Sequence, residues 1–177
     1  IDGDENHLIF GVKRDVTTEH EGEVSTILHD EISEGDMINL SAPVGGFSIE
    51  NTERPQLFIG SGVGMTPLVS MFKKAASLNV PTQMIQAVVT EDERPFAQKL
   101  DSITANHEQA QLHLHVKDKE GYLEAKELEQ YLSEQPEIYI CGGTNFLHSI
   151  INSLKELNYD MNHVHFETFI PRLSVQV

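Results

Sequence analysis

From residue 57 onward, apolar and polar positions follow two alternating periods. Residues 57–59 form a short, wholly apolar run typical of buried strands, and a glycine-rich turn follows it. In residues 66–78 the apolar positions recur along one helical face, at Leu68, Phe72, Ala75 and Ala76. The same reasoning predicts further strands at residues 84–89, 112–116, 138–141 and 164–169, and further helices at residues 95–103, 124–132 and 145–157. Strand and helix therefore alternate through the last two thirds of the chain.

This alternation predicts an α/β fold with a five-stranded parallel sheet flanked by helices, because connections that contain a helix bring successive strands back in the same direction. Ligands of such sheets bind outside the carboxyl ends of the strands. Residues 60–66, 90–92 and 141–144 all follow predicted strands. We therefore expect a nucleotide site where these three segments meet.

The first 52 residues have a different pattern. They predict strands at residues 8–13 and 37–41, a short helix near residues 23–31 and a turn at residues 43–47. Two or three strands and one helix make a poor free-standing core. We expect residues 1–52 to be part of a β-structure whose beginning lies elsewhere, and residues 53–177 to be the α/β domain.

The glycine turn, residues 60–67, is the first candidate for chemistry. Thr66 is a suitable N-cap and Pro67 suits the first helical position. Glycines let a diphosphate approach the backbone, and the start of a helix offers free N–H groups and partial positive charge. An ordinary strand–turn–helix connection would have the same sequence, so the turn alone does not decide between the two.

Charge and cysteine content limit the possible functions. The chain has 28 acidic and 12 basic residues, a formal charge of −16, which disfavours binding to nucleic acids and anionic membranes. No segment approaches the roughly 20 apolar residues of a membrane span. The single cysteine, Cys141, allows no internal disulfide, agrees with a cytoplasmic location and excludes a cysteine-ligated iron–sulfur cluster within this chain. His113 and His115 share a strand face, but nothing supplies a third ligand, and we expect no metal site.

Seven motifs in order resemble the ferredoxin reductase-like family of flavin enzymes, and most closely the reductase part of bacterial flavohaemoglobins, the nitric oxide dioxygenases. The motifs are Val12-Lys13-Arg14, Gly22-Glu23-Val24-Ser25 with Leu28-His29, Gly35-Asp36, Pro43-Val44-Gly45-Gly46-Phe47, Gly62-Val63-Gly64-Met65-Thr66-Pro67, Tyr139-Ile140-Cys141-Gly142-Gly143, and residues 164–171. The resemblance implies an antiparallel FAD-binding β-barrel, of which residues 1–52 would be an incomplete portion, followed by an NAD(P)H-binding domain at residues 53–177. It also implies hydride transfer from nicotinamide to flavin, which then reduces an acceptor.

By this resemblance, Gly62, Val63, Gly64, Met65, Thr66 and Pro67 would hold the nicotinamide nucleotide. Thr66 would lie beside the ring, and Cys141 near the carbon that donates hydride, with Gly142 and Gly143 lining that end. Gly22, Val24 and Ser25 would contact the FAD diphosphate. Glu167 would tune the flavin potential, while Thr168, Phe169, Ile170 and Pro171 would lie against the isoalloxazine. Thr66, Cys141 and Glu167 are thus the candidate catalytic residues.

Each assignment has a plainer alternative. A thiol at a strand end before two glycines should be partly accessible, yet most free cysteines are small buried apolar residues. Phe169 could belong to the core, and Ser25 could bond to its own helix start. Thr90 and Glu91 suit a free ribose 2′-hydroxyl and favour NADH, whereas nearby Arg94 leaves NADPH possible.

The match also has departures. The chain lacks the Arg-x-Tyr-Ser segment that grips the flavin in the family, so we expect FAD binding to be weak or absent in this chain alone. The resemblance implies an upstream barrel half and a globin domain as native partners. Gly143 stands in place of the usual proline, and Ile170 in place of a glycine. A non-catalytic nucleotide-binding or assembly domain is the alternative function.

Overall fold

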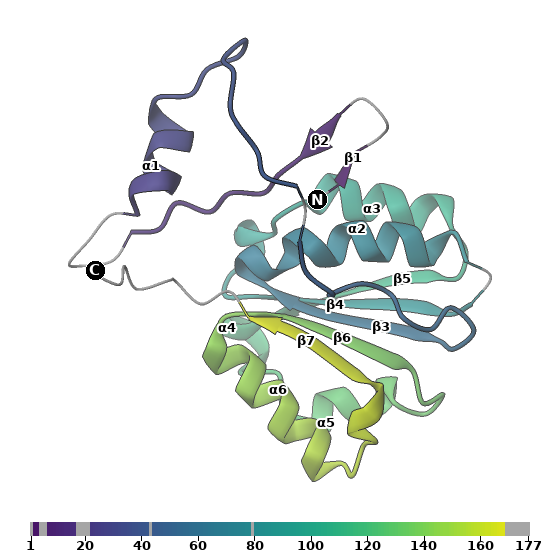
Figure 1. Cartoon of the computed structure of the whole chain (residues 1–177). Coiled ribbons are helices and arrows are strands. Elements are labelled where there is room, and N and C mark those ends of the chain that lie inside the picture. The colour runs from purple at the N-terminus through teal and green to yellow at the C-terminus, as the bar shows by residue number, and fades with distance from the viewer. Residues whose placement is uncertain (1, 4–6, 17–21, 43, 79, 169–177) are drawn as a thin grey trace.

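The computed structural model describes residues 2–3, 7–16, 22–42, 44–78 and 80–168. Its centre is a five-stranded parallel sheet in the order β5-β4-β3-β6-β7 (Figure 1). The strands are β3 (Gln56–Ser61), β4 (Thr82–Val88), β5 (Ala110–Val116), β6 (Glu137–Gly142) and β7 (Val164–Thr168). Every pairing between them is parallel. The predicted α/β class and five parallel strands are confirmed.

Helices cover both faces of this sheet. The helices α2 (Met65–Ala76) and α3 (Ala97–Asn106) lie on one face, and α5 (Ala125–Leu128) and α6 (Thr144–Glu156) on the other (Figure 1). Two hydrophobic clusters fill the space, one around Phe58 and Phe72 and the other around Ile59 and Leu128. The apolar face predicted for residues 66–78 is buried as expected, since Leu68, Phe72, Ala75 and Ala76 belong to the first cluster.

The ends of several elements differ from the sequence-based expectation. The segment predicted as one helix over residues 124–132 is α5 followed by the 3₁₀ turn η3 (Glu129–Tyr131). The helix expected from residue 95 begins at Ala97, because Phe96 adopts a left-handed backbone with φ of 60°. A short helix that the sequence analysis missed, α4 (Lys117–Glu120), follows β5. The other 3₁₀ turns are η1 (Gly62–Gly64), η2 (Glu91–Glu93) and η4 (Met161–His163).

The first 52 residues contain less regular structure than expected. Strands β1 (Asp2–Gly3) and β2 (Leu8–Ile9) form a two-residue antiparallel pair, and α1 (Glu23–Asp30) confirms the expected short helix. The strand predicted at residues 37–41 is wrong, because these residues are exposed and have no strand partner. The described residues before β3 form no barrel, so the portion of an FAD barrel expected here is not seen.

Within the described part of the chain, no helix has both the length and the apolar character needed to cross a bilayer.

Candidate nucleotide-binding site

The turn after β3 and the end of β6 meet at the carboxyl edge of the sheet. Gly60 pairs with Cys141 in the strand register, and the chain then turns through η1 into α2. A Cβ atom on Gly64 would overlap the backbone carbonyl of Cys141 and the backbone nitrogen of Gly142. The structure thus brings together two of the segments predicted to form the site, residues 62–67 and 141–143, and their backbones approach so closely that only glycine fits.

The start of α2 differs in detail from its prediction. The helix begins at Met65 with Gly64 as its N-cap, so Thr66 is the second helical residue and Pro67 the third. The Thr66 hydroxyl does not accept a helix N–H; it donates to the Val63 carbonyl oxygen over 2.8 Å. The expectation that Thr66 caps the helix and Pro67 begins it is therefore wrong. Gly62, with φ of +56°, makes the turn that carries the chain into this helix.

Two helices begin at this edge without a side-chain cap. Neither Gly64 before α2 nor Gly143 before α6 supplies a side-chain acceptor to the first turn. The first backbone N–H groups of a helix have no partner within the helix, and they carry partial positive charge. At the start of α2, the Met65 N–H already donates to the carbonyl oxygens of Gly62 and Val63, and Pro67 has no N–H. The start of α6 is therefore the better set of donors for an anionic group, and Gly62 and Gly143 are both exposed at this edge.

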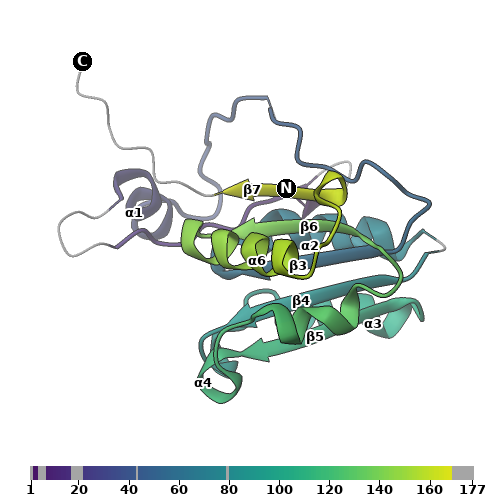
Figure 2. The ribbon, with the colours of Figure 1, turned by 90° about the horizontal axis from the view of Figure 1, so that it is seen from below.

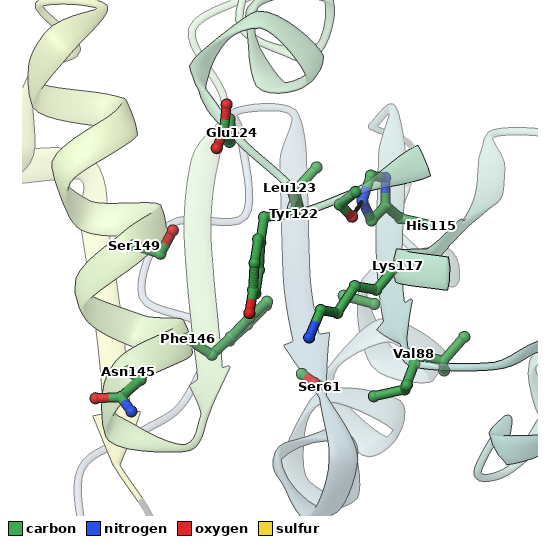
Figure 3. A pocket seen from close by; sticks show the side chains of 13 residues that line it. Ser61, Val88, His115, Lys117, Tyr122, Leu123, Glu124, Asn145, Phe146 and Ser149 are labelled. Atoms are coloured by element: carbon green, nitrogen blue, oxygen red, sulfur yellow. Dashed lines mark hydrogen bonds between the residues drawn. The ribbon is translucent and has the colours of Figure 1, made fainter. Parts of the chain in front are cut away.

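A pocket of about 490 Å³ lies on the α6 side of the same edge (Figure 3). Ser61 at the end of β3, Lys117 and Tyr122 after β5, and Phe146 and Ser149 on α6 line it. Tyr122, Phe146 and Lys117 point toward its middle, and the Lys117 ammonium nitrogen lies 4.4 Å from the centre of the Tyr122 ring. The pocket thus combines aromatic faces, a cation and hydroxyl groups beside the start of α6.

A second groove, of about 570 Å³, lies on the other side of the glycine turn. Gly62, Val63 and Thr66 line it together with Lys13 of the N-terminal segment and Arg94 after η2. A Cβ atom on Gly11 would overlap the Thr66 side chain. The N-terminal segment therefore packs directly against the predicted nicotinamide-binding turn.

The model of the family described as the oxidoreductase NAD-binding domain matches residues 58–151. The chain belongs to this family. The matched range includes most of β3, the glycine turn, β6 and the start of α6, so it contains both uncapped helix starts and the pocket on the α6 side.

Relatives of known name extend this family assignment. The chain is 30% identical over 172 residues to a flavohemoprotein of Bacillus cereus (strain ATCC 10987 / NRS 248), covering 88% of this chain and 43% of that protein. A flavohemoprotein of Pseudomonas aeruginosa is 28% identical, with coverage of 90% and 43%. The chain thus spans less than half the length of these curated relatives.

A solved structure shares the fold. The flavohem-like FAD/NAD binding domain of nitric oxide dioxygenase from Vibrio cholerae O1 biovar El Tor superimposes with a TM-score of 0.79. It is 28% identical in sequence, and the match covers 90% of this chain and 70% of that one. The CS-b5R domains of human Ncb5or share the fold alone, at a TM-score of 0.70 and 20% identity over 82% of this chain and 45% of that one.

Cys141 is fully buried in this family fold, with 0% of its surface exposed. Its side chain belongs to the hydrophobic cluster that includes Phe58 and Tyr139. Burial, together with the charge of Glu167, raises the pKa of the thiol to about 12, so the sulfur is a neutral thiol at physiological pH. The expected partial accessibility is wrong, because the β6 backbone, not the thiol, faces the turn at Gly64.

Glu91, one of the two residues predicted to select the cofactor, lies in an exposed ion pair. Its carboxylate accepts from Lys119 Nζ over 2.5 Å, and this contact holds the pKa of Glu91 below its ordinary range. Thr90 precedes it as the N-cap of η2. Arg94 turns away from both, since its Nη2 donates to Asp101 over 3.0 Å and its Nε donates to Gln86 over 3.4 Å.

The predicted flavin residues lie apart from the pocket. At the start of α1, the Ser25 hydroxyl donates to the Gly22 carbonyl oxygen and accepts from the Asp15 N–H, both over 3.0 Å, and Val24 is exposed. Glu167 and Thr168 end β7 at the carboxyl edge, opposite Cys141 and Gly142 in the register. Phe169, Ile170 and Pro171 lie outside the described residues.

The two histidines of β5 have partners within the chain. His113 Nε2 lies 3.1 Å from Gln83 Oε1, and the ring packs at 4.8 Å against Tyr131. His115 is buried, and its Nε2 lies 3.0 Å from the Gly121 carbonyl oxygen. Among the described residues no group of three His, Cys, Asp or Glu side chains is placed to hold a metal ion.

Sequence reasoning missed the side chains that shape the pocket. Lys117 and Tyr122 follow β5 and Phe146 lies in the first turn of α6, all at the edge where ligands of parallel sheets bind. Sequence reasoning applied that rule after three of the five predicted strands; applying it also after residues 112–116 would have found Lys117 and Tyr122. Gly142 and Phe146 also depend on each other, because a Cβ atom at Gly142 would overlap the Phe146 ring.

Proposed function

We propose that this chain binds NADH at the carboxyl edge of its sheet, as the NAD(P)H-binding part of a flavin oxidoreductase. The observation that carries the proposal is the uncapped start of α6 beside a pocket that holds Tyr122, Phe146 and Lys117, next to the glycine turn that follows β3. A dinucleotide needs donors for its diphosphate and an aromatic or apolar surface for its base. Both requirements are met within one edge of the sheet.

The charge of the chain makes this arrangement necessary. A protein with a formal charge of −16 repels an anionic cofactor unless the site is locally positive. Backbone N–H groups of residues 62–64 and 142–144 and the Lys117 ammonium group can supply this correction. The diphosphate would lie along the turn, with Gly62, Val63, Gly64 and Met65 on one side of it and Gly142 and Gly143 on the other.

NADH is preferred over NADPH in this proposal. A 2′-phosphate needs an unpaired cation near Thr90 and Glu91. Arg94 is already paired with Asp101, and Lys119 is paired with Glu91 itself. The carboxylate of Glu91 would accept from a free ribose hydroxyl. Replacing Glu91 with Gln should reduce the preference for NADH over NADPH, as measured by parallel titrations; an unchanged ratio would exclude Glu91 as the selecting residue.

The catalytic end of the site is proposed from the resemblance and from where the residues lie. Thr66 would lie beside the nicotinamide ring, and the Cys141 backbone would line it, since the thiol is buried. Bound FAD would accept hydride from the nicotinamide and reduce an acceptor one electron at a time. Glu167 and Thr168 are at the same edge, where a carboxylate could tune a flavin. Gly22, Val24 and Ser25 remain the proposed contacts of the FAD diphosphate.

By analogy with the flavohemoproteins, the partners would be an upstream FAD-binding half-barrel and a globin domain, and the acceptor reaction nitric oxide dioxygenation. These are properties of longer proteins, of which this chain covers 43% in the relatives named above.

A titration with NADH, followed by its fluorescence, tests the nucleotide site directly. Tyr122→Ala should weaken binding by about two- to tenfold, the range expected for losing one aromatic contact. Phe166→Ala is the matched control, because Phe166 is also an exposed aromatic residue but does not line the pocket. Equal affinities for wild type and Tyr122→Ala would place the nucleotide elsewhere.

A non-catalytic nucleotide-binding or assembly domain is the second candidate. The hydrogen bonds of Ser25 favour it. The Ser25 hydroxyl donates its proton to the Gly22 carbonyl oxygen and accepts from the Asp15 N–H, so this proton is engaged within the chain and not directed at a flavin diphosphate. Adding FAD and an artificial acceptor to the chain, and measuring oxidation of NADH, separates the two candidates. Turnover that requires FAD supports the oxidoreductase. NADH binding without turnover, even after a flavin-binding half-barrel is fused to the chain, supports the second candidate.

A further inference from the structure

On the face of the sheet that α2 covers, opposite to the pocket and α6, three aromatic rings stack across neighbouring strands. Phe58 on β3, Tyr139 on β6 and His165 on β7 occupy the same level of the strand register. The Phe58 and Tyr139 rings stack with centres 5.3 Å apart, and the Tyr139 and His165 rings stack at 4.8 Å. The row of stacked rings therefore ends at His165 on the edge strand β7, and the His165 ring can carry a charge.

This row of rings holds the segment that enters β3. We call residues 47–54 the junction segment; in Figure 2 the chain that leads to β3 runs past β7. Phe47 packs edge-on against Tyr139 with ring centres 6.2 Å apart, and the Glu50 backbone N–H donates to the Tyr139 hydroxyl over 3.0 Å. The Glu50 carboxylate lies 3.6 Å from His165 Nδ1.

Charged and titratable groups face His165 from every element packed around it. From β6, the buried Glu137 carboxylate lies 2.9 Å from His165 Nε2. From the junction segment come Glu50 and Arg54, whose Nε lies 3.7 Å from Glu137. From η4 and the residue before it come His163, 2.8 Å from Glu137, and Asp160, 3.8 Å from His163. On β7 itself, Glu167 lies two residues further along the same face.

The two histidines of this group differ in how their second nitrogen is placed. His163 Nε2 lies 2.8 Å from Arg54 Nη1, which can only donate, so His163 Nε2 must accept and Nδ1 carries the proton toward Glu137. That arrangement fixes the tautomer of His163. His165 instead has a carboxylate facing each nitrogen, Glu137 at Nε2 and Glu50 at Nδ1. Only the protonated ring can donate to both.

We propose that His165 is a positioning residue that fastens the junction segment to the sheet when it is protonated. With both nitrogens protonated, the ring joins Glu137 of β6 to Glu50 of the junction segment. With one proton, it keeps Glu137 and loses its donor to Glu50.

Amide hydrogen exchange of residues 48–54 tests this in the intact chain without any cofactor, so its outcome is independent of the proposed nucleotide site. After correction for the intrinsic effect of pH on exchange, protection should be about two- to fivefold higher at pH 6 than at pH 8, the range for a partly exposed ion pair. Glu137 stays ionised throughout, because hydrogen bonds from His165 and His163 outweigh its burial and keep its pKa below the ordinary value.

Three variants decide the assignment. His165→Gln and Glu50→Gln should each remove the pH response, and His148→Gln, a change of an exposed histidine on α6, should keep it. If His165→Gln does not fold, Glu50→Gln carries the test alone, because Glu50 is largely exposed. Equal protection at both pH values in the wild type, stronger protection at pH 8, or a response that survives in Glu50→Gln would each overturn the proposal.

Discussion

Similar apolar runs fold very differently in the two halves of this molecule. In β3, Leu57, Phe58 and Ile59 are fully buried between strands β4 and β6. In the segment before it, Met37 is 98% exposed and Leu40 is more than half exposed. An alternation of apolar and polar residues indicates only that one side of a segment is apolar. Whether it becomes a strand depends on neighbours that can pair with it and cover it.

The difference also shows where the stability of this chain is concentrated. The sheet has apolar clusters on both faces, and its strands pair along their full lengths. Before β3, the described pairing consists of the two residues each of β1 and β2 and a single bridge residue, Val16. We therefore expect substitutions in the two regions to differ most in their effect on unfolding.

The strongest test of this comparison uses one large apolar residue from each region. Phe72→Ala, in the core between α2 and β3, should lower the free energy of unfolding by about 3–5 kcal/mol. Met37→Ala should change it by less than about 0.5 kcal/mol. Urea unfolding followed by circular dichroism measures both. A comparable loss in the Met37 variant would show that its surroundings are packed in solution.

A second test asks which glycine of the turn the sheet requires. Gly64→Ala should destabilise the fold by about 1–3 kcal/mol, because the new Cβ pushes the turn away from the β6 backbone. Gly62→Asn is the control, since Gly62 has open space around it and asparagine tolerates its left-handed backbone; its cost should be at most about 1 kcal/mol. A larger loss of thermal stability in Gly62→Asn than in Gly64→Ala would contradict the close approach of the glycine turn to β6.

A third prediction concerns the amino end of the sheet. Burial raises the pKa of Glu137 and hydrogen bonds from His165 and His163 lower it, with a net decrease from 4.5. A carboxyl with a lowered pKa contributes stability that is complete above pH 4.5 and is lost as the pH falls through the folded-state pKa. Glu137→Gln should cost about 1 kcal/mol at pH 7 and flatten the loss of stability below pH 4.5. Parallel unfolding curves from pH 7 to pH 3 measure both effects; an equally steep acid loss in the variant would argue against this cause.

The smallest expected effect is at the other edge of the sheet. Burial lowers the pKa of His113 from 6.5, so the folded state favours the neutral ring. The corresponding stability is complete above pH 6.5 and is lost as the pH falls below it. His113→Gln keeps a hydrogen-bonding partner for Gln83 and should reduce this loss between pH 6.5 and 5. The effect should be smaller than that of Glu137→Gln, and a steeper loss in the variant would contradict it.

Local patterns predicted the sheet region well because each pattern there has its partner nearby in the chain. The apolar stripe of Leu68, Phe72 and Ala75 lies on α2, which packs against β3, the strand just before it in the chain. The parallel order of the strands follows from the helical connections between them. The short helix α4 was missed because Lys117–Glu120 has no apolar face to give it a period. The start of α2 was misplaced because Gly64, a residue without a side-chain acceptor, takes the N-cap position that threonine usually prefers.

The candidate site was predictable to the extent that it is made of backbone. Glycines at the ends of β3 and β6 indicated close approach, and the structure places them together. Which way Tyr122 and Phe146 point depends on how α5 and α6 pack, and no local period of apolar residues encodes this packing. The burial of Cys141 likewise depends on the stacking of β3, β6 and α2 around it.

Because the single thiol of the chain, that of Cys141, is buried in the sheet, its rate of chemical modification reports how often the sheet opens. A thiol-specific reagent should modify the native protein only as fast as β6 separates from its neighbours, and ligands that grip the strand ends should slow the labelling.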